Sequence, residues 1–493
     1  MTETVTIQRL TGVTCRLIGP KDAAILADET LIVPHPSAKF QKRYRRRGWD
    51  GMVHFYQKAK GVFPSGLAYK VSKALKKGGF KVKFDYPNLS YRPIPLDSLL
   101  GIELRSYQSR AVDVVEKSRG ASIQCPTAGG KTEIGAELIR RTGFRTLWMC
   151  NGISLMYQTQ QRLMRRLGVR VGVIGDGKFD LEDITVGIVN SLSRITDKDF
   201  WPIWEQLIID EAHLGSAKTW YDCSNLCVNA YIRMNLSGTM KTGDEFRDMR
   251  AEAAAGPVVP IVTTMELADL GFVARPTVVM LRAPRESYPS WEQIRDNVAP
   301  DWRDNPQVLR PRGGELFSHA YDLGVIRNKA RTELVTAIVK KHLRRKERIL
   351  LACKRTYHGS VLQAAIFDAR CTWLWGESSA KERETSIEKF KNTEGGAVLV
   401  ASEIFKTGID IPEIDVLILA TGGKSSIDIL QWCGRSMRVR PGKKTVLIYD
   451  FIDGRTTTDK RDYLGSHSKA RLEEYENAGF TVATPKKLDY SWL

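Results

Sequence analysis

The sequence contains no apolar run close to the ~20 residues that a helix needs to cross a bilayer. Its first residues lack the apolar core of a signal peptide, and its eight cysteines are scattered rather than spaced as a disulfide framework. Cys223 and Cys227 have no second pair in register, which favours buried or incidental thiols over a zinc site. We therefore expect no membrane partner and a reducing location, the cytoplasm, or the host cytoplasm if the protein is viral.

Acidic residues are scarce in the first fifth of the chain. Residues 1–95 contain 18 lysines and arginines but only 6 acids, so this segment carries +12 of the formal net charge of +19. The whole chain, with 42% hydrophobic and 27% charged residues, has an ordinary globular composition and is too long for one core, so about two to four domains are expected. The concentrated positive charge predicts a module that binds a polyanion.

The positive charge is densest between Lys39 and Lys83, where 14 basic residues face one acid, Asp50. A strand is predicted over 52–56 and an amphipathic helix over 70–80. The interleaved aromatic side chains can stack on bases or fill a small core, and core packing is favoured for each one individually. The alternative for the charges is a solvated basic face. We predict that DNA is bound by Lys42, Arg43, Arg45, Arg46, Arg47, Trp49, Lys73, Lys76 and Lys77.

The motif with the clearest chemistry is Cys-Pro-Thr-Ala-Gly-Gly-Lys-Thr at residues 125–132. The apolar run 121–124 predicts a buried strand before it, and 133–141 predicts a helix after it. Backbone N–H groups of such a loop and helix N-terminus face phosphates, while Lys131 and Thr132 can hold the terminal phosphates and Mg²⁺. The motif predicts a nucleoside triphosphate site. The alternative is a surface turn that happens to contain these residues.

Strand and helix patterns alternate over 144–239, which is typical of a parallel sheet covered by helices. Polar clusters at 127–132, 210–213 and 237–239 each follow a predicted strand, so they are expected to meet at the carboxyl edge, where ligands bind. Asp210 is expected to hold Mg²⁺, and Glu211 to orient and deprotonate the attacking water. For an isolated Asp-Glu-x-His the alternative is a helix N-cap.

A second alternating series begins near residue 315 and contains no second phosphate loop. Instead, Arg435 and Arg438 stand three apart in a predicted helix, 425–437, and are expected to share one face. Guanidinium groups so placed could reach a γ-phosphate, although ordinary surface arginines are the alternative. The predicted domains are a basic DNA-binding domain at 1–92, α/β domains at 93–275 and 321–493, and a linker or insertion at 276–320.

Together, the phosphate loop, Asp-Glu-Ala-His at 210–213, Ser-Gly-Thr at 237–239, Gly-Ile-Asp-Ile-Pro at 408–412 and the Gln431–Arg438 segment resemble the motifs of superfamily two helicases. The resemblance covers about residues 104–451. It implies an α/β fold of two RecA-like doubly wound parallel-sheet domains in tandem, preceded here by a small basic α+β domain. Segments 48–51, 63–67, 404–412 and 467–482 are in addition similar to the phage UvsW-type recombination helicases, which remodel branched DNA.

The resemblance also implies roles for single residues. ATP and Mg²⁺ would be held by Arg105 and Gln108 at the base, by Thr127, Gly129, Gly130, Lys131 and Thr132 at the phosphates, and by Asp210 at the metal. His213, Ser237 and Thr239 would couple the ATP site to DNA, while Gly408 and Asp410 would sense nucleotide and strand. Gln431, Arg435 and Arg438 would contact the γ-phosphate. Departures from the family pattern occur at Ala128, Cys150–Gly152, Asn190 and Trp375.

The sequence therefore predicts an ATP-dependent DNA helicase or translocase that unwinds or remodels forks, D-loops, R-loops and Holliday junctions. Three alternatives stay open: a duplex translocase without strand separation, an RNA helicase, and, least favoured, a non-catalytic nucleic-acid-binding or annealing protein. The expected partner is DNA, with RNA in hybrids as a further substrate. The chain is expected to be monomeric or weakly associating.

Overall fold

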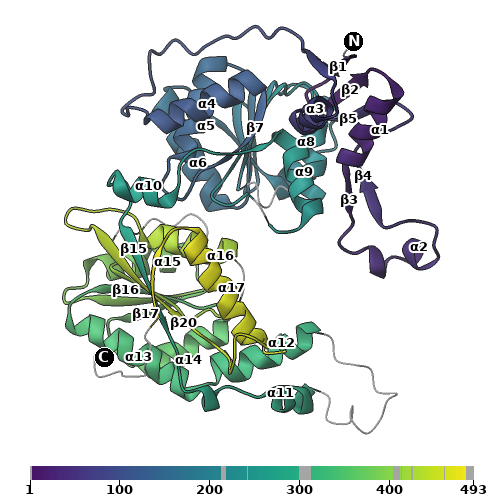
Figure 1. Ribbon diagram of the computed structural model, residues 1–493. Helices are drawn as coiled ribbons and strands as arrows, with labels where there is room; N and C mark the ends of the chain where they lie inside the picture. Colours follow the sequence, from purple (N-terminus) through teal and green to yellow (C-terminus); the bar gives the residue numbers. More distant parts are fainter. Residues whose placement is uncertain are drawn as a thin grey trace. The chain divides into compact units, whose positions relative to one another are not determined.

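The computed structural model describes residues 3–211, 218–240, 242–298, 313–402, 411, 413–423, 426–459 and 461–484. The chain divides into two compact units, Met1–Val262 and Thr263–Leu493 (Figure 1). Among the described residues, no helix has both the length and the apolar character that a membrane span requires.

The first unit begins with a small α+β part, as predicted. Its sheet has the strand order β5-β2-β1-β6, in which β1 is antiparallel to β2 and parallel to β6. The elements are β1 (Thr4–Arg9), β2 (Thr14–Ile18), α1 (Lys21–Thr30), β5 (Val62–Pro64), η2 (Ser65–Leu67), α3 (Ala68–Lys77) and β6 (Lys81–Asp85). The antiparallel strands β3 (Ile32–Pro34) and β4 (Met52–His54) form a ribbon that leads to η1 (Ala38–Phe40) and α2 (Lys42–Arg45) (Figure 1).

The rest of the first unit is a sheet with the order β10-β9-β11-β8-β12-β13-β7-β14. Its described strands are parallel to their neighbours, except that β10 is antiparallel to β9. The strands are β7 (Gly120–Gln124), β8 (Thr146–Cys150), β9 (Gly172–Gly175), β10 (Lys178–Asp180), β11 (Ile184–Ile188), β12 (Gln206–Asp210), β13 (Ile232–Ser237) and β14 (Val258–Pro260). The helices are α4 (Ser106–Ser118), α5 (Lys131–Thr142), α6 (Ile153–Leu167), α7 (Val189–Leu192), α8 (Lys218–Leu226) and α9 (Glu245–Ala255).

The second unit has a parallel sheet with the order β17-β18-β16-β19-β20-β15-β21. Its strands are β15 (Arg275–Leu281), β16 (Arg348–Ala352), β17 (Cys371–Leu374), β18 (Ala397–Ala401), β19 (Val416–Leu419), β20 (Thr445–Phe451) and β21 (Thr481–Ala483). Its helices are α10 (Thr264–Asp269), α11 (Trp291–Val298), α12 (Gly313–Tyr321), α13 (Lys329–Arg344), α14 (Thr356–Ile366), α15 (Ala380–Asn392), α16 (Ser426–Ser436) and α17 (Tyr463–Asn477).

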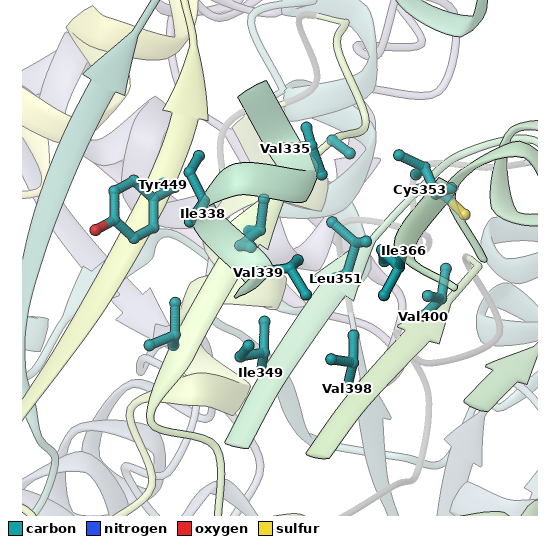
Figure 2. Packing of buried hydrophobic residues seen from close by; sticks show 14 of the residues in the cluster. Val335, Ile338, Val339, Ile349, Leu351, Cys353, Ile366, Val398, Val400 and Tyr449 are labelled. Atoms are coloured by element: carbon teal, nitrogen blue, oxygen red, sulfur yellow. The ribbon is translucent and has the colours of Figure 1, made fainter. Parts of the chain in front are cut away.

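Burial on both faces explains why these strands are continuous apolar runs. All five residues of β8 and of β18 are buried. In the second unit the core forms where helix side chains meet the central strands, and Figure 2 shows Val335, Ile338 and Val339 of α13 beside Ile349, Leu351, Val398 and Val400. Helix ends also follow local rules: at the start of α15, Ser379 Oγ accepts a hydrogen bond from the Glu382 N–H at 3.2 Å and the Glu382 carboxylate accepts one from the Ser379 N–H at 2.6 Å, which together form a capping box.

Two boundaries differ from the predicted ones. The segment 276–320, predicted as a linker or insertion, contains most of β15, which pairs with β20 and β21 in the second sheet, and it also contains α11 and part of α12. The residues of 1–92 and the phosphate-loop domain form one compact unit, because Met249 and Ala253 of α9 are buried in the hydrophobic core of the small sheet.

Candidate functional site

The phosphate loop lies between β7 and α5, at the carboxyl edge of the first unit's large sheet. The Cys125 N–H donates to the Ser237 carbonyl at 2.9 Å, and the Gly129 N–H donates to the Pro126 carbonyl at 3.0 Å. Gly130 has a φ of +80°, and a Cβ there would lie 2.1 Å from Gln108 Nε2, so both its conformation and its surroundings require glycine. Ala128 has a φ of 67°, which explains why the family usually has glycine at this place.

The loop is held in place by the first turn of α4 and by Arg105, the residue directly before that helix. Gln108 is buried, its Nε2 donates to the Gly129 carbonyl at 3.0 Å, and its Oε1 accepts from the Arg105 N–H at 2.9 Å. Tyr107, to which the sequence assigned no role, donates from its hydroxyl to the same Gly129 carbonyl at 2.9 Å and accepts from Arg105 Nη1 at 2.8 Å. Arg105 and Gln108 therefore shape the phosphate loop in this structure, in addition to their expected role at the base.

The acid pair follows β12. Asp210 is buried and its Oδ1 accepts from the Glu211 N–H at 3.0 Å, while Glu211 Oε1 lies 3.9 Å from Lys131 Nζ. Burial raises the pKa of Asp210 to about 6, the Glu211 carboxylate acts in the same direction, and the Lys131 ammonium opposes both. Glu211 has a φ of 54°, a strained conformation that turns the chain directly after the strand. Lys131, Asp210 and Glu211 thus meet at the phosphate loop.

Ser237 ends β13, the strand beside both β7 and β12. Its hydroxyl donates to the Thr239 carbonyl at 2.9 Å and accepts from the Thr239 N–H at 3.3 Å. Because the Ser237 carbonyl accepts the hydrogen bond from the Cys125 N–H, this turn contacts the phosphate loop directly. Three predicted site residues, His213, Gly408 and Asp410, lie outside the described residues.

The oxygen donors and N–H groups at this edge fit a magnesium-bound triphosphate. The half-buried Thr132 hydroxyl and the Asp210 carboxylate are hard oxygen ligands of the kind Mg²⁺ prefers. Gly129 and Gly130 have no side chains, so the backbone of the loop can approach a phosphate closely. Helix α5 begins directly after them, and its first N–H groups point toward the same phosphate position.

In the second unit, Gln431 and Arg435 are half-buried on α16, four residues apart and therefore on one face. The prediction that Arg438 shares a helix face with Arg435 is wrong, because α16 ends at Ser436. The Ala274 N–H donates to the Met437 carbonyl at 2.7 Å, and Arg438 forms a β-bridge with Val273. Pairing with the segment before β15 therefore draws the chain out of the helix.

The predicted DNA-binding residues form two basic clusters in the first unit. Lys42, Arg43, Arg45, Arg46 and Arg47 are exposed on α2 and the turn after it, and Lys73, Lys76 and Lys77 are exposed on α3. Trp49 differs, because its indole N–H donates to the Met52 carbonyl at 2.8 Å and its ring packs edge-on against His35, with centroids 5.6 Å apart. Trp49 thus braces residues 35–51, the basic arm that β3 and β4 carry, in line with the preference for aromatic packing.

Sequence patterns missed a buried charge network in the second unit. Arg331 Nε lies 2.7 Å from Asp453 Oδ1, and Arg471 Nε lies 2.9 Å from Asp450 Oδ2, with all four side chains buried. The Arg331 and Asp453 positions are 122 residues apart, so no local signal connects them. The network joins α13 and α17 to the carboxyl end of β20.

Comparisons with known proteins agree with this geometry. Residues 101–242 match the family described as the res subunit of type III restriction enzymes, and residues 330–440 match the helicase conserved C-terminal domain. The ATP-dependent DNA helicase uvsW of Enterobacteria phage T4 is 22% identical over 90% of this chain and 91% of its own length. The DNA 3'-5' translocase XPB2 of Sulfurisphaera tokodaii is 24% identical over 70% of this chain and 81% of its own.

Among solved structures, the ATP-dependent type ISP restriction-modification enzyme LlaBIII, bound to DNA, matches with a TM-score of 0.57 and 13% identity. The match covers 86% of this chain and 36% of the enzyme. It supports the α/β architecture of the two units. With the ordered motifs and the two matched families, it follows that the chain belongs to the superfamily two helicases, the ATP-dependent DNA helicases and translocases, and resembles the phage UvsW-type members.

Proposed function

We propose that this helicase unwinds or remodels branched DNA, such as forks, D-loops, R-loops and Holliday junctions, at the expense of ATP. The observation that carries the ATP-driven part is the meeting of Lys131, Asp210 and Glu211 beside the phosphate loop. The branched-DNA part is supported by the basic clusters on α2 and α3 and by the similarity to the T4 helicase along nine-tenths of the chain.

The chemistry follows from the first unit's own residues. N–H groups of the loop and of α5 bind the phosphates, Lys131 neutralises their terminal charge, and Thr132 and Asp210 would hold the metal. Mg²⁺, when bound, supplies positive charge to the β- and γ-phosphate oxygens. Glu211 orients the attacking water and accepts its proton. Its carboxylate lies 3.9 Å from the Lys131 ammonium, so base and phosphate-binding cation stand side by side at the loop.

The second unit supplies cations to the same reaction. Gln431, Arg435 and Arg438 contact the γ-phosphate, and an arginine in this role contributes roughly 10³–10⁵ in rate where it has been measured. Gly408 and Asp410 sense nucleotide and strand, and His213, Ser237 and Thr239 couple hydrolysis to DNA. Binding and hydrolysis of ATP then alternately join and separate the two units, which moves one strand along the protein.

The test is DNA-stimulated ATP hydrolysis by two variants. Lys131→Ala and Glu211→Gln are expected to abolish it, while Lys117→Ala, at an exposed position on α4, is expected to leave it unchanged. Unwinding of forked, D-loop and four-way substrates by the unaltered protein then tests the substrate class. Full turnover by either variant would refute the ATP site, and unwinding of linear duplex alone would refute the branched-DNA proposal.

Translocation along duplex DNA without strand separation is the second candidate. It is favoured by a relative described as a DNA translocase and by the structural match to a DNA-bound restriction enzyme. Displacement of a triplex-forming strand without displacement of a duplex strand would establish it. RNA as the main substrate would be indicated if RNA outcompetes DNA in stimulating ATP hydrolysis.

A further inference from the structure

Helix α9 completes the hydrophobic core of the N-terminal module, which we define as residues 3–86. Met249 and Ala253 of this helix are buried in the module's core, and Phe246 packs against it. The Phe246 ring lies 5.1 Å from the ring of His35 and 6.3 Å from that of Phe55, at the base of the ribbon that carries α2. One face of a helix in the phosphate-loop domain therefore belongs to the module.

The N-terminal module approaches the phosphate-loop domain so closely that two positions of the module require glycine. A Cβ on Gly66 would lie 2.1 Å from the Glu252 carbonyl oxygen of α9, and a Cβ on Gly12 would lie 2.3 Å from the Ala230 carbonyl oxygen. The Gly12 N–H donates to the Val228 carbonyl at 2.5 Å. Such close backbone approach is typical of a fixed interface and not of a flexible tether.

Charged side chains add to the same interface. Lys70 Nζ of α3 lies 2.8 Å from Glu252 Oε2 of α9. The buried Arg9 guanidinium lies between Tyr86 and Tyr231, with distances of 5.6 and 5.7 Å to the ring centroids. The Tyr231 hydroxyl donates to the Leu10 carbonyl at 3.3 Å. The module is thus held by apolar, ionic and cation–π contacts together.

The opposite face of α9 is attached to the strands that carry the ATP site. Asn235 Nδ2 of β13 donates to the Ala251 carbonyl at 2.9 Å, and Ser122 Oγ of β7 donates to the Gly256 carbonyl at 2.8 Å. At the start of the helix, Asp248 Oδ1 accepts from both the N–H and the hydroxyl of Thr242, each at 2.8 Å. Thr242 follows Thr239 by three residues, so a short segment joins the Ser-Gly-Thr turn to α9.

We propose that α9 is a positioning element that makes the DNA-holding module move together with the Ser-Gly-Thr turn. The contacts of Lys70 and Phe246 then determine how much DNA movement each hydrolysed ATP produces. This inference rests on the proposed ATP-driven action on DNA. A module fixed to β7 and β13 through α9 moves with the phosphate-loop sheet, whereas a loosened module lets the sheet move without the bound duplex.

The experiment breaks and restores one contact of the interface. Lys70→Glu places two carboxylates together, and the double variant Lys70→Glu, Glu252→Lys exchanges the charges and restores the pair. For Lys70→Glu we expect base pairs unwound per ATP to fall by about 3- to 30-fold, with ATP hydrolysis in the absence of DNA unchanged. The double variant should recover most of this ratio, although residue 70 still carries a negative charge.

Phe246→Ala provides a second, uncharged disruption, with Glu245→Ala on the exposed side of α9 as its control. A thermal melt confirms that each variant is folded. If Lys70→Glu keeps the unaltered ratio, or if the charge exchange fails to restore it, the proposal is wrong. If the unaltered protein hydrolyses no ATP in the presence of DNA, the proposed function fails instead, and the two failures are thereby distinguished.

Discussion

His358, in α14, is a fully buried histidine whose ring nitrogens have no hydrogen-bond partner among the described residues. Burial lowers its pKa to about 3, with a smaller contribution from the positive charge of Arg331. The imidazole is therefore neutral in the folded protein at every pH at which a helicase works. An unfolded chain would protonate the same side chain near pH 6.5.

This difference makes the second unit sensitive to acid. Between about pH 6.5 and pH 3 the unfolded state binds a proton that the native state excludes, so native stability falls as pH decreases through this window. The slope from one such group is at most about 1.4 kcal/mol per pH unit. On acidification from about pH 6 to pH 4, the free energy of unfolding of His358→Leu should decrease less than that of the unaltered protein, as measured by urea unfolding.

The matched control is His319→Leu, because His319 is exposed on α12. Equal loss of stability on acidification in the unaltered protein and in His358→Leu would contradict a buried neutral histidine at this position.

At the scale of elements, the sequence predicts what local patterns determine and misses what long-range strand pairing determines. Strands such as β8 and β18 were predictable because burial on both faces makes them continuous apolar runs. The meeting of 127–132, 210–211 and 237–239 was predictable because parallel strands share a carboxyl edge. In contrast, the partner of β15 is β20, which lies more than 160 residues later, so local patterns could not show that β15 belongs to the second sheet.

The same limit explains the arginines of the second unit. Helical spacing placed Arg435 and Arg438 on one face, yet Arg438 pairs with Val273, which local periodicity cannot reveal. Gln108 is a related case, because only the folded loop brings the Gly129 carbonyl to its amide. Motif spacing thus predicts which residues gather, and long-range pairing determines what each side chain contacts.

The docking of α9 predicts an effect of one methyl group. Gly66→Ala should destabilise the first unit by about 1–3 kcal/mol, because the new Cβ overlaps the Glu252 carbonyl and the backbones must separate. Gly48→Ala, where the nearest atom to the new Cβ is 3.7 Å away, should change stability by less than about 0.5 kcal/mol. Chemical denaturation of both variants measures the difference, and equal stabilities would argue against a tight interface.

At the scale of the whole molecule, the uneven charge determines how DNA affinity depends on salt. Each phosphate neutralised by the arm contributes about −0.9 to the slope of log affinity against log salt for duplex DNA. Replacing Lys42, Arg43 and Arg46 by alanine should therefore reduce the steepness of this slope by about 2–3. Fluorescence anisotropy with a labelled fork at several salt concentrations gives the slope.

The control for this measurement removes the same charge elsewhere. Lys340, Arg344 and Lys346 are exposed at the end of α13 and the turn after it, and their replacement by alanine should leave the slope almost unchanged. Equal slopes for the two triple variants would mean that the arm does not hold the duplex. The prediction for the arm depends on the module being part of the first unit, which residue composition alone did not indicate.

The central proposal is that one triphosphate would be bound by carboxylates and a lysine of the first unit and by guanidinium groups of the second. Steady-state ATP hydrolysis with forked DNA, measured for the unaltered protein, Glu211→Gln and Arg435→Ala, tests it most directly. The account predicts that both variants still bind a fluorescent ATP analogue but hydrolyse ATP at least roughly 10³-fold more slowly. Hydrolysis at the unaltered rate by Arg435→Ala would contradict it.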